Sequence, residues 1–491
     1  MALERNFWGH SMIHNSGLRL SGPENQDVRL RKCAIYPALG FRSVLTWSVI
    51  RMTRWRFTAI NESGLPFISG LCVIAQKYPS VRSAMLALAS SLRPALSLKN
   101  ISSTSAPGYS QHHEPFDLDS SALERCQSAL KDLQTKISKV NVSQANNDDV
   151  VELLVSVLIM ITAGFPSGSR STQDADWTLH ISGIVSLIES LDQTEIQSAY
   201  VSRLAREIAA YLDIGVFSLG SLSQSKNRRA WLTWNIEHPE TPQETDFSPM
   251  EVMLGYPRSL ITLIAAMAAL LECQDRGEVD LLTQTTVDKL YERACQGCEY
   301  VAPTTEQQIQ ETRAISGELF SRFETALTLW TQPVVPLRIS TSVSLALTTA
   351  WEIMRKACLI YLWRGGLKKN VLHQLSPVHA RIAGKFIREM IVGLQALIHM
   401  YDEQRITIMN IMTWPTVIVA NECGNDRGLQ TAVLNVLRGM CQRFAIQHIQ
   451  HLIIVVEELW RRVEHNIDAM YPPHISMEEI SREMGFCLPL F

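Results

Sequence analysis

Cysteine is sparse in this chain. Its ten cysteines are spread over 491 residues, and most stand inside apolar segments. Such cysteines are typical of free thiols in a reducing compartment, whereas a small secreted domain uses closely spaced pairs as a disulfide framework. The first 20 residues also lack the apolar core of a secretory signal, because His10, His14 and Arg19 interrupt them. We therefore expect neither secretion nor a disulfide scaffold.

Long apolar runs are missing as well. The longest, at residues 153–165 and 260–271, have 13 and 12 residues, whereas a helix that spans a bilayer needs about 18. We expect both to be buried core helices and expect no contact with a membrane.

A large net charge is also lacking, since the chain sums to −3 at pH 7. Residues 1–60, however, carry nine basic and three acidic side chains, a local charge of +6, so the other 431 residues sum to −9. A basic leader of this kind favours nucleic-acid contact or nuclear import, but a solvated tail without a role has the same composition. The candidates for weak phosphate contacts are Arg29, Arg31, Lys32, Arg51, Arg54 and Arg56.

Helical periodicity is what the sequence has in abundance. Apolar residues recur every three or four positions in segments such as 341–364, 376–401 and 403–422. The clearest stripe runs from Leu434 to Leu459 and predicts one amphipathic helix. Alternating strand patterns are few and lack hairpin turns. We predict an all-α fold, built as a large multi-helix array.

Changes in composition divide the chain into three regions. Residues 1–71 are basic and are expected to be poorly ordered, residues 72–470 are expected to form an all-helical domain, and residues 471–491 are expected to be a C-terminal tail. Within the helical region, residues 100–119 are rich in Ser, Pro and His and predict a long loop.

The usual catalytic motifs are missing too. The chain has no glycine-rich phosphate loop, no His-Glu-x-x-His and no Gly-x-Ser-x-Gly. Cys295 and Cys298 have zinc-knuckle spacing, but a tetrahedral site needs four ligands and the next cysteine is Cys358. We therefore predict that the protein is not an enzyme, with no catalytic residues, no cofactor and no metal site.

Five short segments follow one another in an order that is typical of one family. They are Trp177–Gly183, Met253–Leu260, Ala357–Arg364, Trp414–Cys423 and Glu457–Arg462. Together they resemble the fungal transcription factor domain, the regulatory region that usually follows a binuclear zinc cluster, over about residues 80–460. The positions that carry the resemblance are Trp177, His180, Tyr256, Pro257, Tyr361, Arg364, Trp414, Pro415, Glu422 and Trp460.

These positions are interpreted as packing elements of a helical scaffold. The prolines fit first-turn positions, and the aromatic rings are expected to be buried with a partner for each N–H or O–H. Glu422 lies on a mostly apolar helix and is expected to pair with Arg364 or Arg427.

One departure from the family concerns DNA binding. A binuclear zinc cluster needs six closely spaced cysteines, and residues 1–71 contain only Cys33. The sequence is similar in this respect to zinc-less members of the family that control secondary-metabolite genes, such as the regulator of trichothecene biosynthesis. A shortened gene product that lost its cluster is the alternative.

The resemblance implies a nuclear transcription regulator of a fungal pathway. It would reach DNA only indirectly or weakly, through other regulators or as a homodimer, and a small-molecule inducer is expected. Two other classes stay open: an all-helical biosynthetic enzyme and a non-transcriptional interaction scaffold. The enzyme would be indicated by a deep cavity into which an unpaired Glu422 or His180 points.

Overall fold

The computed structural model describes residues 75, 77–88, 120–139, 147–164, 217–219, 232, 255–295, 312–335, 339–444, 448–466 and 473–490. All of them belong to the unit formed by residues 47–491. Nearly every described segment is helical, and the strands in this part of the chain form a single two-stranded pairing. The prediction of an all-α fold is confirmed.

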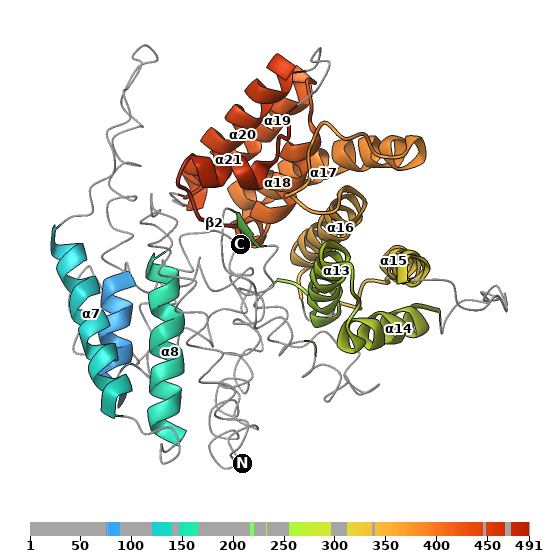
Figure 1. Cartoon of the computed structure of the whole chain (residues 1–491). Helices are drawn as coiled ribbons and strands as arrows, with labels where there is room; N and C mark the ends of the chain where they lie inside the picture. The colour runs from blue at the N-terminus through green and yellow to red at the C-terminus, as the bar shows by residue number, and fades with distance from the viewer. Residues whose placement is uncertain are drawn as a thin grey trace, which may run out of the picture. The chain divides into compact units, whose positions relative to one another are not determined.

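The helices follow one another along the chain, and those from α17 to α20 lie close together in sequence (Figure 1). They are α7 (Ser120–Lys139), α8 (Asn147–Gly164), α13 (Arg258–Arg276), α14 (Leu281–Cys295), α15 (Thr312–Leu329), α16 (Thr341–Arg364), α17 (Pro377–Gln404), the 3-10 helix η4 (Ile408–Ile411), α18 (Thr413–Glu422), α19 (Arg427–Phe444), α20 (His448–Asn466) and α21 (Met477–Glu483). The strands are β1 (Ser218–Leu219) and β2 (Leu488–Pro489). No helix in the described ranges is long and apolar enough to cross a bilayer.

A buried carboxylate joins the helical residues 79–88 to α7 and α8. Glu152 on α8 accepts a hydrogen bond of 2.5 Å from the Ser80 hydroxyl and lies 2.9 Å from the Lys136 ammonium of α7. Lys136 also donates to Asp149, 2.7 Å away. Hydrogen bonds to Asp149 and Glu152 raise the pKa of Lys136, so the ammonium stays charged between the two acids.

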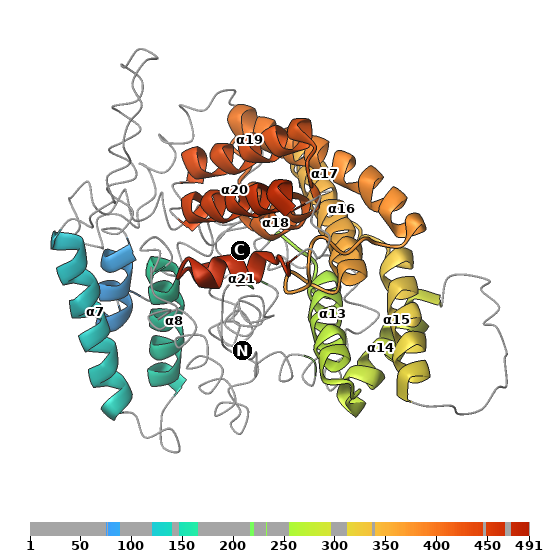
Figure 2. The same ribbon diagram turned by 45° about the horizontal axis from the view of Figure 1, so that its top comes forward.

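Helix α18 is the core of the C-terminal helices. Every residue from Thr413 to Asn421 is buried, and α16, α17, α19 and α20 all contact this helix (Figure 2). A helix that is apolar on all sides is stable in water only when other elements cover it completely. The run Trp414–Ala420 therefore places α18 at the centre and its neighbours around it.

The stripe from Leu434 to Leu459 belongs to two helices, contrary to the single helix predicted from it. α19 ends at Phe444, α20 begins at His448, and the two pack against each other. Their apolar faces meet the same core, with Leu437 and Leu452 both fully buried. Because both helices present a face of the same period, the sequence pattern continues across the break.

The C-terminal segment is integrated into the helical core, although the sequence suggests a separate tail. β2 pairs antiparallel with β1, joining Leu488 to Leu219, and the backbone N–H of Leu490 donates to Phe217 at 2.8 Å. Met477 and Ile480 of α21 are fully buried. The segment is short and half polar, so its apolar residues show no clear period, and the sequence alone does not reveal that they are buried.

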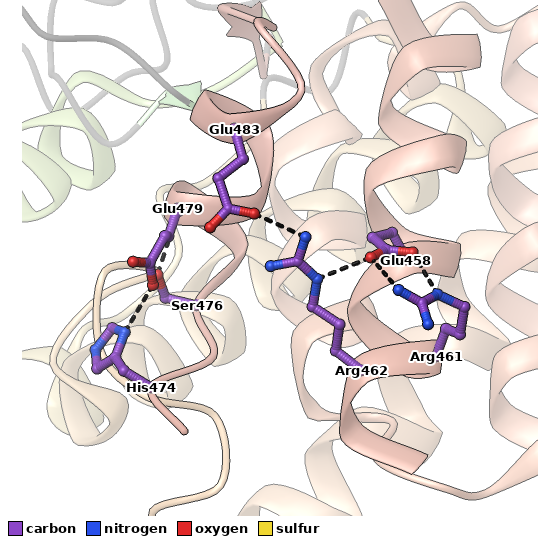
Figure 3. A network of polar contacts seen from close by, with 7 residues as sticks. All are labelled: Glu458, Arg461, Arg462, His474, Ser476, Glu479 and Glu483. Atoms are coloured by element: carbon purple, nitrogen blue, oxygen red, sulfur yellow. Dashed lines mark hydrogen bonds and ion pairs between the residues drawn. The ribbon is translucent and has the colours of Figure 1, made fainter. Parts of the chain in front are cut away.

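An ion-pair network fixes α21 to α20 (Figure 3). Arg462 of α20 lies 2.7 Å from Glu483 of α21 and donates at 2.8 Å to Glu458 on its own helix. Glu458 also accepts two hydrogen bonds of 2.6 Å from Arg461. Hydrogen bonds from Arg461 and then Arg462 lower the pKa of Glu458 to about 2.

The low pKa of Glu458 predicts a stability contribution that depends on pH. In the unfolded chain the carboxyl titrates near its ordinary pKa of about 4.3, so the contribution is complete above that value and is lost as pH falls towards 2. Glu458→Gln should lower the free energy of unfolding by about 1 kcal/mol at pH 7. The difference between wild type and variant, measured by urea unfolding from pH 7 downward, should shrink below about pH 4.5. A pH-independent difference would contradict the prediction.

The end of α16 requires glycine. Gly365 and Gly366 have φ of 76° and 93°, and a Cβ on Gly366 would lie 3.2 Å from the Tyr361 hydroxyl. Gly366→Ala should therefore lower the free energy of unfolding by about 1–2 kcal/mol. Gly317→Ala is the matched control: this α15 position has open space and an ordinary helical φ, so alanine should stabilise by about 0.5–1 kcal/mol. Equal effects at both sites in thermal unfolding would refute the argument.

Candidate functional site

The most distinctive polar group in the core is an ion pair between the ends of two helices. Arg364, the last residue of α16, donates to both oxygens of Glu422, the last residue of α18, at 2.8 and 2.5 Å. The side chains are 11% and 6% exposed. This bidentate geometry is the strong form of an arginine–carboxylate contact.

The positions of these two residues explain why they depend on each other. A carboxylate at the C-terminal end of a helix faces the negative end of the helix dipole, where it is disfavoured. Glu422 is held there by Arg364 and by the Asn421 amide, which donates at 2.9 Å. Arg364 also donates to the backbone oxygen of His373, so it joins α16, the following loop and α18.

Arg427, the other partner considered for Glu422, has a different role. It lies 2.5 Å from Glu464 of α20 in a pair whose side chains are 71% and 51% exposed. Solvent screens such a pair, which contributes little to stability. The structure therefore assigns Glu422 to Arg364.

Trp414 lies fully buried in the first turn of α18. Its ring meets Phe217 edge-on at a centroid distance of 5.4 Å and Tyr361 at 5.6 Å. Against the expectation that each buried ring finds a polar partner, its indole N–H has none among the described residues. Pro415 is the next residue, in the first helical turn where its missing N–H costs nothing.

Trp460 and Trp351 use their N–H groups to fix other elements. Trp460 of α20 donates at 2.9 Å to the Ala420 carbonyl in the last turn of α18, which also accepts the backbone N–H of Cys423 at 3.4 Å. Trp351 of α16 donates at 2.9 Å to the Gly255 carbonyl. Tyr256 and Pro257 follow, both buried, and the Pro257 carbonyl accepts the first hydrogen bond of α13 at 3.0 Å.

These contacts make one continuous scaffold from α13 to α20, and the comparison with known families agrees with it. The chain matches the family described as Fungal specific transcription factor domain over residues 51–482. The chain belongs to this family. No curated protein and no solved structure matches the chain.

Membership of the fungal transcription factor domain family assigns the chain to transcription regulation. The family is a regulatory domain, which favours a non-catalytic protein. Glu422, the acid that would have marked an active site, is instead paired with Arg364. His180, the other such candidate, and Trp177 lie outside the described residues, as do the phosphate-contact candidates of the basic leader.

Two buried cysteines of this fungal transcription factor domain, Cys358 and Cys423, are suited to packing. Burial raises the pKa of Cys358 above its usual range and that of Cys423 to about 12, so neither thiol forms a nucleophilic thiolate near neutral pH. Within the described ranges no three side chains of His, Cys, Asp or Glu gather as a metal site would require.

One polar cluster escaped the sequence analysis. Trp363 of α16 donates its indole N–H to Glu324 of α15 at 2.6 Å and stacks on the His379 ring of α17 at 4.6 Å. The three residues stand on three helices and share no local spacing, so only a knowledge of helix packing could have brought them together.

Proposed function

We propose that this protein is a nuclear transcription regulator of a fungal secondary-metabolite gene cluster and that it acts through protein partners. The observation that carries the proposal is the match to the fungal transcription factor domain over residues 51–482. The helical scaffold around α18 supports the proposal, because its polar core residues stabilise the packing of the helices. Partners would then bind at the surface of the protein.

Deleting the gene in its native host and measuring transcripts tests the proposal. A regulator is expected to change the levels of a group of neighbouring transcripts together. An enzyme of the same pathway would instead leave transcripts unchanged and cause one intermediate to accumulate. Unchanged transcripts would refute the proposal.

A reporter assay tests transcriptional activity separately. The full chain is fused to an unrelated DNA-binding domain, and reporter output is compared with that of the DNA-binding domain alone. A change in output in either direction supports the proposal, and a fluorescent fusion should concentrate in the nucleus. Silence in the native host, with the fusion protein present at normal levels, would favour the interaction scaffold.

A further inference from the structure

Helix α17 presents an outward face with an unusual pattern. Its inner face packs on α16, α18 and α19 through residues such as Ile387 and Leu394. On the outer face, five exposed residues follow one another at alternating spacings of three and four. They are Val378, Arg381, Lys385, Arg388 and Val392, and we call them the α17 seam. This spacing is the 3.5-residue repeat that keeps one helix face against a second helix.

The charges of the α17 seam are largely unused within the protein. Arg381 and Arg388 make no hydrogen bond or ion pair in the part of the chain that the structure describes. Lys385 is 74% exposed and reaches Glu389 only at 3.8 Å. Glu389 in turn lies 2.8 Å from Lys356, which neutralises it. The seam is therefore a basic strip on a body whose residues 61–491 sum to −9.

The ends of the seam are apolar although they face water. Val378 and Val392 are 57% and 66% exposed. β-branched residues are not good helix formers, so exposed valines on α17 stabilise neither the helix nor the core. Their separation of fourteen residues corresponds to about 21 Å along the helix axis. A partner that uses the whole seam must be apolar at both ends and acidic between them.

We propose that the α17 seam docks an acidic amphipathic helix of a partner protein. Apolar residues of that helix cover Val378 and Val392, and carboxylates between them pair with Arg381, Lys385 and Arg388. Charge complementarity would orient the partner helix and increase its rate of association. The two valines would supply the apolar contact.

Two other occupants fit less well. A second copy of the chain would place Lys385 opposite Lys385 and Arg381 opposite Arg388 in an antiparallel seam, and like charges repel. A nucleic-acid backbone would match the three cations but leave both valines exposed, since phosphates offer no apolar surface. The acidic helix alone uses every residue of the seam.

The test measures binding of a synthetic helical peptide to the full chain by fluorescence anisotropy. The peptide carries leucines at its first and last seam positions and glutamates at the three between. We expect saturable binding that weakens as salt is raised. Arg381→Glu with Arg388→Glu should weaken binding by about tenfold or more, and Val378→Ala with Val392→Ala by about threefold. Circular dichroism verifies that each variant remains helical.

The matched control is Lys131→Glu with Lys289→Glu, which changes the net charge equally at exposed positions on α7 and α14. It should leave affinity within about twofold, because these sites lie outside the seam. The proposal fails if wild type does not bind the peptide, if the control loses as much affinity as the seam variant, or if the valine variant binds normally. It also fails if mixed-sequence duplex DNA displaces the peptide, or if the arginine reversal dissociates a dimer of the chain.

This inference goes beyond the proposed function and does not rest on it. Peptide binding is measured with purified protein, whereas the regulator role is measured by transcripts in the host. Either can fail while the other stands.

Discussion

Replacing Glu422 by glutamine is expected to lower the free energy of unfolding by about 3–5 kcal/mol. The substitution keeps the shape of the side chain but leaves the Arg364 guanidinium, 11% exposed, without its counter-charge. A buried charge that loses its partner cannot regain the hydration it gave up on folding. Urea unfolding followed by tryptophan fluorescence measures the loss.

An exposed ion pair in the same group of packed helices, Arg427 with Glu464, gives the matched control. Glu464→Gln removes the charge partner of Arg427 at an equally short distance, but both groups are solvated and the expected loss is below about 1 kcal/mol. The double variant Arg364→Met, Glu422→Leu should cost less than the sum of its two single changes, because no uncompensated charge remains. A loss at Glu422 no larger than at Glu464 would mean that water reaches the pair.

Trp414→Ala is expected to cost about 3–5 kcal/mol, since the ring is fully buried against Phe217 and Tyr361. Its indole N–H has no partner within the described residues, so Trp414→Phe loses ring volume and no hydrogen bond. We expect that change to cost less than about 1.5 kcal/mol.

Trp460→Phe is the control for the hydrogen bond. Trp460 donates to the Ala420 carbonyl at 2.9 Å, so the change to phenylalanine should cost about 1 kcal/mol more than the same change at Trp414. If Trp414→Ala left thermal unfolding unchanged, the ring would be exposed in solution. If Trp414→Phe were the costlier of the two phenylalanine variants, the Trp414 N–H would have a partner.

The helix bounds show how far periodicity alone reaches. The stripe over 341–364 coincides with α16, whose ends are marked by a serine cap at Ser340 and by Gly365. The stripe over 403–422 contains the short η4 and α18, and that from Leu434 to Leu459 spans α19 and α20. Periodicity identifies the apolar face of each helix. It does not show where one helix ends and the next begins when the break between them is too short to disturb the pattern.

The residues of the candidate site also differ in how far the sequence alone predicted them. Glu422 attracts attention because it is an acid on an apolar helix, and two arginines were candidate partners in the sequence. Trp363, Glu324 and His379 gave no signal as a group, because they lie on three helices and share no local spacing. The basic strip on α17 is visible in the sequence only once the opposite face of that helix is known to be buried.

By itself, the sequence determined an all-helical protein with an apolar helical stripe at residues 403–422 and a strongly basic segment at residues 1–60. These properties depend on composition and on residues three or four positions apart. Only the tertiary structure decided that Arg364, 58 residues from Glu422, is its partner and that residues 473–490 belong to the core. It also decided that Arg381 and Arg388 of α17 have no ion-pair partner among the described residues. Those outcomes depend on which helix ends and faces meet, and contacts between distant segments are set by packing of the whole core.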